Sequence, residues 1–202
     1  MARKSKSRPS KFEVAIVGEG ITEWFYFSNM RQQERFSFKV EHDLPKHSDF
    51  KSIIKTARKK RDEGYDLVFC VLDLDRILTN DTERNGYFLE KSKTNSNRGI
   101  EFIETMPCIE LWFLLHFLDT YSAKIYLNYN QVSVPLKQHL PDYEKTAKFL
   151  KTIHLYEYLE KNGNSKKADE YGIRLAAEKV LSNNPLFNFT QINYLINKLK
   201  SH

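Results

Sequence analysis

The sequence is poor in cysteine, which argues against two common ways of stabilising a protein of this size. Only Cys70 and Cys108 are present, and neither stands in a Cys-x-x-Cys or histidine-rich pattern. We therefore expect neither a zinc site nor a disulfide framework. The sequence also lacks an apolar run of membrane-span length and the apolar N-terminal stretch of a secretory signal. These absences predict a cytoplasmic protein that binds no membrane.

A phosphate-binding P-loop is also missing, because the turn GEGIT at residues 18–22 lacks the consecutive Lys-Ser/Thr pair of that motif. Glu19 and Glu23 stand on this glycine-flanked turn, directly after the apolar residues 14–17. Phosphate-binding turns place a Lys or bare backbone at this point. Acidic residues here therefore indicate that something positively charged binds at the turn.

The composition is that of one domain with a basic balance. The chain has 202 residues, of which 41% are hydrophobic, and its formal net charge is +6. This is enough apolar surface to bury a core. Several basic residues lie within residues 1–11. A solubilising flexible tail and a tail that binds phosphates both stay open, and the charge fits a nucleic-acid partner without establishing one.

Strand and helix patterns alternate in the first part of the chain. Residues 13–17, 36–43 and 65–75 have strand patterns, and residues 21–33 and 49–63 between them have helical spacing. The order β-α-β-α-β predicts an α/β fold with a mostly parallel sheet flanked by helices.

The later part of the chain is predicted to be mainly helical. Residues 79–98 are polar and predict a loop or short helix, 99–105 a strand, and 108–118 an apolar helix that begins near Pro107. The segments that follow, including 189–200, have helical spacing. We therefore divide the chain into a tail at 1–11, an α/β core at 12–120 and a helical C-terminal portion packed on the core at 121–202.

Three carboxylates are expected to meet at one edge of the sheet. Glu19 follows the first predicted strand, and Asp73 and Asp75 form a DxD at the end of the strand 67–72. Parallel strands share the edge at which ligands bind, and i and i+2 side chains of an extended segment share a face. Carboxylates held together recruit a cation, and Mg²⁺ or Mn²⁺ suits such ligands. A solvated loop is the alternative for each motif alone.

Two further glutamates are candidates for the same site. Glu23 is either a first-turn residue that complements the helix dipole or a ligand of a second metal ion. Glu110 lies in the first turn of a very apolar helix, where a buried carboxylate would need a partner. His116 on that helix is interpreted as a packed, hydrogen-bonded histidine.

Several stretches resemble known proteins. The segments VAIVGEGITEWFYF (14–27) and LVFCVLDLDR (67–76) resemble the Toprim catalytic core. The segment MPCIELWFLLHF (106–117) narrows the resemblance to the RloB-like family. The segments DYEKT (142–146) and NPLFNFTQINYLINKL (184–199) are also similar to the family, so that the resemblance covers roughly residues 12–200.

The resemblance implies a Toprim-like α/β fold and a metal-dependent nuclease of anti-phage defence and abortive infection, often beside an ATPase of the AAA or ABC type. Carried over by position, Glu19 is the Toprim glutamate, and Asp73 and Asp75 are the metal-binding pair. Glu23 matches the second acid of the turn, and Glu110 the acid of the Pro-Cys block. These five acids are the expected catalytic residues.

The hypothesis is a nuclease that uses Mg²⁺ or Mn²⁺ and contacts the nucleic-acid backbone through Arg76, Lys55, Arg58 and Lys59. Solvated surface residues are the alternative for these four. The sequence does not distinguish tRNA, other RNA and DNA as the substrate. A homo-oligomer is also possible from the sequence. The competing hypothesis is a non-catalytic Toprim-like subunit that binds nucleic acid or nucleotide and works with an ATPase partner.

Overall fold

A five-stranded sheet forms the centre of the protein. The computed structural model describes residues 12–36, 39–43, 49–95, 99–122 and 124–201, so the predicted tail lies outside the described residues. The strands are arranged in the order β2-β1-β3-β4-β5. They are β1 (Glu13–Val17), β2 (Lys39–Asp43), β3 (Leu67–Asp73), β4 (Ile100–Met106) and β5 (Phe189–Thr190). The pairs among β1 to β4 are parallel, which confirms the predicted mostly parallel α/β sheet.

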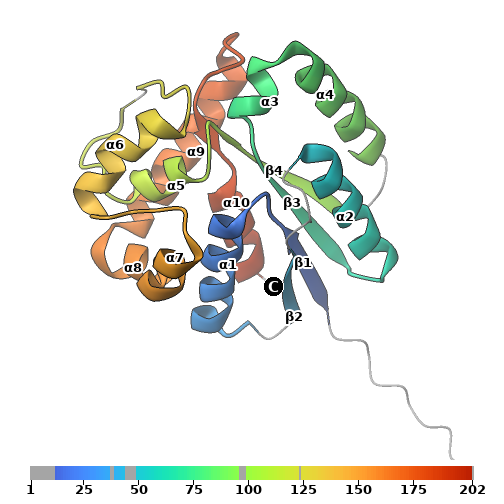
Figure 1. Cartoon of the computed structure of the whole chain (residues 1–202), viewed down its shortest axis with the longest axis horizontal. Helices are drawn as coiled ribbons and strands as arrows, with labels where there is room; N and C mark the ends of the chain where they lie inside the picture. The colour runs from blue at the N-terminus through green and yellow to red at the C-terminus, as the bar shows by residue number, and fades with distance from the viewer. Residues whose placement is uncertain (1–11, 37–38, 44–48, 96–98, 123, 202) are drawn as a thin grey trace, which may run out of the picture.

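Helices cover both faces of the sheet (Figure 1). Helices α2 (Phe50–Asp62) and α4 (Asp81–Asn95) lie on one face, and α1 (Ile21–Glu34) and α10 (Ile192–Lys200) lie on the other. Right-handed crossovers explain this arrangement, because the chain moves from β1 to β2 in one direction and from β2 through β3 to β4 in the other. The same topology fixes all four parallel strand ends at one edge.

The remaining helices pack together on the α1 side (Figure 1). Their bounds are α5 (Glu110–Leu115), α6 (Tyr129–His139), α7 (Ala147–Ile153), α8 (Leu155–Asn162) and α9 (Ser165–Leu181). The short helix α3 (Asp75–Thr79) follows β3 directly. Every residue of α5 is buried, so this helix forms the core between the sheet and the C-terminal helices.

Two predicted elements differ from the structure. The prediction of a helix over 189–200 was wrong at its start, because Phe189 and Thr190 form β5, antiparallel to β4, with the Thr190 and Thr105 hydroxyls 3.1 Å apart. The segment 79–98 contains a full helix, α4, where a loop or short helix was expected. The segment is mostly polar, so its sequence did not indicate a packed helix. Tyr87 is nevertheless buried, and its ring packs edge-on against Phe50.

Among the described residues, no helix is both long and apolar enough to cross a membrane.

Candidate metal-binding active site

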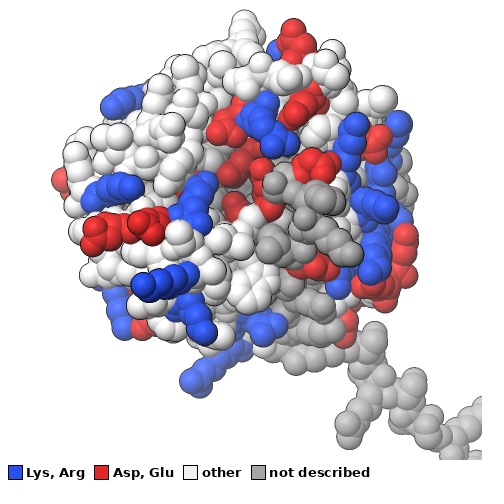
Figure 2. Space-filling view, viewed as in Figure 1, with Lys and Arg blue, Asp and Glu red and all other residues white. Residues whose placement is uncertain are grey.

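Three neighbouring strands end at the same edge and bring acidic residues together. Glu19 follows β1, Asp73 is the last residue of β3, and Glu110 follows β4 after a short turn. Strands β1, β3 and β4 are adjacent and parallel, so their carboxyl ends form one site, as in other open α/β sheets. Figure 2 shows Asp and Glu side chains gathered near the middle of this face, with Lys and Arg side chains around them.

Backbone hydrogen bonds hold two of the acids in place. The Asp73 N–H donates to Glu19 Oε2 at 3.3 Å, and the Ile109 N–H donates to Asp73 Oδ1 at 2.9 Å. The second bond links the end of β3 to the turn that precedes α5. Both acids are thus oriented by main-chain groups of the strand ends, which is a rigid support for a ligand set.

Glu23 has a structural role and also lies in the acidic site. Its Oε2 accepts a hydrogen bond from the Gly20 N–H at 2.9 Å, which closes the first turn of α1. Gly18 makes room for it, because a Cβ at this position would lie 2.8 Å from the Glu23 Cβ. Glu23 therefore lies in the first turn of the helix, as one of the two interpretations expected. Its side chain is also buried, and its charge raises the pKa of the neighbouring Asp73.

Glu110 is the most deeply buried acid of the site. The residue is 0% exposed, and its Oε1 accepts from the Tyr143 hydroxyl at 2.7 Å and pairs with Lys145 Nζ at 2.9 Å. Its other oxygen, Oε2, is buried and has no hydrogen-bond partner in the described part of the chain. A buried carboxylate oxygen without a donor is costly, so a cation or a proton at this atom would be strongly stabilising.

The thiol of Cys108 lies in the same cluster. Ligand atoms of Asp73, Cys108 and Glu110 all lie within 4.8 Å of one another. Burial, followed by the charges of Glu110 and Asp73, raises the pKa of the thiol. The sequence predicted no role for this cysteine, because it stands in no recognised metal-binding spacing.

Burial and mutual repulsion disfavour the charged forms of these acids. Burial and then the Glu23 charge raise the pKa of Glu19 to about 7. Burial and then Glu110 raise the pKa of Glu23, and burial with Glu23 and Glu19 raises the pKa of Asp73 well above its usual range. Burial is also the main reason that the pKa of Asp75 is raised. Such a cluster either holds protons or binds a cation.

In the absence of metal, the contribution of Glu19 to the free energy of unfolding is expected to fall as the pH rises from 4.5 to about 7. Within this window the folded protein holds a proton that the unfolded chain has lost, so a higher pH favours unfolding. The upper limit is on the order of 3 kcal/mol. Urea unfolding in EDTA between pH 4.5 and 8, with Glu19→Gln as the reference, measures the difference. A difference that is flat across this range would contradict the shift.

The structure changes the expected geometry of the DxD. The prediction that Asp73 and Asp75 share a face of an extended segment was wrong, because Leu74 has helical backbone angles and Asp75 begins α3. Asp75 Oδ1 accepts from the Arg76 N–H at 2.6 Å, and the residue lines an open cavity of about 350 Å³. Asp75 therefore lies at the rim of the site, while Asp73 lies inside it.

The four expected nucleic-acid contacts are not brought together. Arg76 lies beside the acids, where its charge lowers the pKa of Glu19, and it also pairs with Glu83. Arg58 donates to Glu90 and Thr94 of α4 and so joins two helices. Lys55 and Lys59 are exposed on α2, on the sheet face opposite α1 (Figure 1).

Two site residues come from far along the chain. Tyr143 and Lys145 belong to the segment before α7, and both contact Glu110. The charge of Lys145 also acts on Glu23, Asp73 and Asp75. The sequence DYEKT (142–146), which contains both, was the available signal, although no role was assigned to it.

A comparison with protein families matches the chain to the family described as RloB-like protein over residues 14–199. The match covers nearly the whole chain, including every acid described above. No curated protein and no solved structure matches the chain.

Proposed function

The chain belongs to the RloB-like protein family, and from this premise and the acidic site we propose that it is a metal-dependent nuclease that cleaves phosphodiester bonds of nucleic acid. The observation that carries the proposal is the convergence of Glu19, Asp73 and Glu110 at three adjacent strand ends. Carboxylates at the C-terminal edge of a parallel sheet are the ligands that Mg²⁺ and Mn²⁺ use in phosphoryl-transfer sites.

The residues fit a divalent cation. Glu110 Oε2 lacks a partner, and the carboxyl groups around it repel one another in their charged forms. Asp73 and Glu110 are the inner ligands of the proposed site, with Glu19 beside Asp73 and Asp75 at the rim. The thiol of Cys108 lies in the same cluster, but its raised pKa keeps it protonated, so the carboxylate oxygens are the ligands and suit Mg²⁺ or Mn²⁺.

A bound divalent cation supplies Lewis-acid stabilisation of the phosphate and lowers the pKa of a water. The chain supplies the other parts. Glu19, which accepts a hydrogen bond from the Asp73 N–H beside the proposed ligands, is a carboxylate that can accept a proton from a water. The Lys145 ammonium and the Arg76 guanidinium stand beside the acids as positive groups for the substrate phosphate.

The proposed setting is bacterial anti-phage defence by abortive infection, with an AAA or ABC-type ATPase as the partner that controls the nuclease. RNA, including tRNA, and DNA are the candidate substrates.

The test is cleavage of labelled tRNA, single-stranded DNA and duplex DNA in the presence of Mg²⁺, Mn²⁺, Zn²⁺ or EDTA. Each reaction is run with and without an ATPase encoded beside this protein. We expect cleavage with a divalent cation, none in EDTA, and none with Glu19→Ala or Asp73→Ala. Absence of cleavage under every condition would overturn the proposal and favour a subunit that binds nucleic acid without cutting it.

A further inference from the structure

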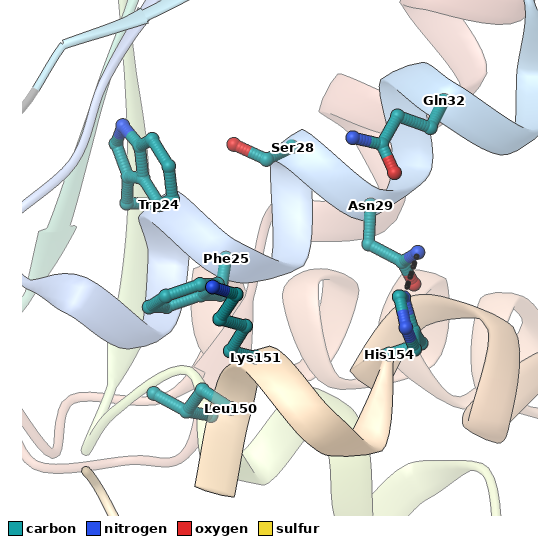
Figure 3. A pocket seen from close by; sticks show the side chains of 8 residues that line it. All are labelled: Trp24, Phe25, Ser28, Asn29, Gln32, Leu150, Lys151 and His154. Atoms are coloured by element: carbon teal, nitrogen blue, oxygen red, sulfur yellow. Dashed lines mark hydrogen bonds between the residues drawn. The ribbon is translucent and has the colours of Figure 1, made fainter. Parts of the chain in front are cut away.

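A cavity along α1, the helix that begins at the acidic site, carries an inference that rests on the proposed function and deepens it. The cavity has a volume of about 240 Å³ and lies between α1 and the end of α7. Figure 3 shows its lining side chains, which come from α1 on one side and from residues 150–154 on the other. They are Trp24, Phe25, Ser28, Asn29, Gln32, Leu150, Lys151 and His154.

The lining combines aromatic surface with free polar groups. Trp24 is 39% exposed and meets the Phe25 ring edge-on, with the ring centroids 4.9 Å apart. Within the described part of the chain, the side chains of Ser28, Gln32 and Lys151 have no recorded hydrogen-bond or ion-pair partner. An exposed indole, an amide, a hydroxyl and an ammonium are the groups that proteins use to stack on a base, read its edge and contact its phosphate.

Hydrogen bonds across the cavity fix its two sides relative to each other. Asn29 Oδ1 accepts from the Glu157 N–H at 2.9 Å, and Asn29 Nδ2 lies 3.4 Å from His154 Nδ1 (Figure 3). These bonds tie α1 to the start of α8. The cavity is thus a preformed space between two segments that are bonded to each other, and it is lined in part by unpaired polar groups, as small-ligand sites are.

Two segments lead from the acids to the cavity. Trp24 directly follows Glu23 at the start of α1, and Ser28 lies about 6 Å further along that helix. Lys145, which pairs with Glu110, lies just before α7, and Lys151 lies in the last turn of that helix. Helices α1 and α7 thus both run from the acids to the cavity, which gives a strand bound at the acids a path along them.

We propose that the α1–α7 cavity binds one unpaired base of a single-stranded substrate, next to the phosphate held at the acidic site. Trp24 stacks on the base, Gln32 and Ser28 contact its edge, and Lys151 contacts the adjoining phosphate. The cavity volume suits a single base and leaves no space for a base pair. The substrate is accordingly a single strand, a loop or a splayed end.

Tryptophan fluorescence tests this directly, because the chain has two tryptophans and Trp112 is buried with its Nε1–H bonded to Tyr26. Single-stranded RNA and DNA tetranucleotides are titrated, with Mg²⁺ present, against the full chain carrying Glu19→Ala, a variant that is expected not to cleave. We expect saturable quenching, and at least about 10-fold weaker binding of tetranucleotides without bases. The variant Trp24→Phe, which retains only Trp112, should show no quenching.

Labelled oligonucleotides supply the matched comparison by fluorescence anisotropy. Trp24→Ala should weaken binding at least about 10-fold. Lys151→Ala should weaken binding and reduce the slope of log affinity against log salt concentration by about one. Lys166→Ala, an exposed lysine of α9, should leave both unchanged. Equal affinity for abasic and normal tetranucleotides, or unchanged affinity in Trp24→Ala, would overturn the base site. Base binding without any cleavage would support the base site and contradict only the proposed nuclease activity.

Discussion

Replacing Asp73 by Asn should abolish metal-dependent cleavage and, in EDTA, make the protein more stable. Asn keeps an oxygen for the Ile109 N–H, so the turn before α5 is preserved while the charge is lost. Loss of this proposed ligand should lower kcat/KM by at least about 10³-fold, the scale seen when a group that acts in the transition state is removed. Stability should rise because Asp73 no longer repels Glu23 and Glu19.

Cleavage kinetics and urea unfolding at pH 8 measure the two effects. Saturating Mn²⁺, at about 100 times its Kd, should raise the free energy of unfolding of the wild type by about 2.7 kcal/mol. It should add little to Asp73→Asn. Asp81→Asn is the matched control, since Asp81 is an exposed residue of α4 that pairs with Arg84. A variant that cleaves at the wild-type rate would remove Asp73 from the mechanism.

The sheet could be predicted because each main strand has a recognisable pattern in its own residues. Strands β1 and β3 are continuous apolar runs bounded by glycine or acid, which is typical of strands buried on both faces. The alternation with helices then fixed a parallel sheet and placed Glu19 and Asp73 at one edge. Strand β5 was missed because two residues carry too little periodicity to be distinguished from the helix that follows them.

The position of Asp75 depended on a contact that local sequence does not record. The Pro107 carbonyl accepts hydrogen bonds from the N–H groups of Leu74 and Asp75, each at 3.2 Å. These bonds end β3 and begin α3, so the alternation Asp-Leu-Asp does not continue as a strand. The partner is more than thirty residues away, and its placement requires β4 to pair with β3 first.

The partners of Glu110 were hidden for the same reason. A buried Glu in an apolar helix demands a partner, and the sequence indicated that one was needed. Its identity follows from how the segment before α7 packs against α5, which no pattern within either segment determines. The sequence therefore predicted that acidic residues lie at the strand ends. It did not predict which residue, Lys145, supplies the positive charge beside them.

The second large effect is expected at Lys145. In Lys145→Met, Glu110 keeps only the Tyr143 hydroxyl and remains a buried carboxylate without a cation. Breaking a fully buried ion pair costs about 3–5 kcal/mol. The Lys145 side chain is 37% exposed, so we expect a loss of about 2 kcal/mol in the free energy of unfolding in EDTA at pH 8.

A double-mutant cycle separates this charge effect from lost packing. Adding Glu110→Gln to Lys145→Met should recover most of the stability, because the uncompensated charge is gone. Lys148→Met, an exposed lysine of α7, should change little. Mn²⁺ should stabilise Lys145→Met more than the wild type, since a metal ion would then compensate Glu110 in place of the ammonium. Equal stabilisation of both proteins by Mn²⁺ would mean that Glu110 is a structural acid and takes no part in holding the metal.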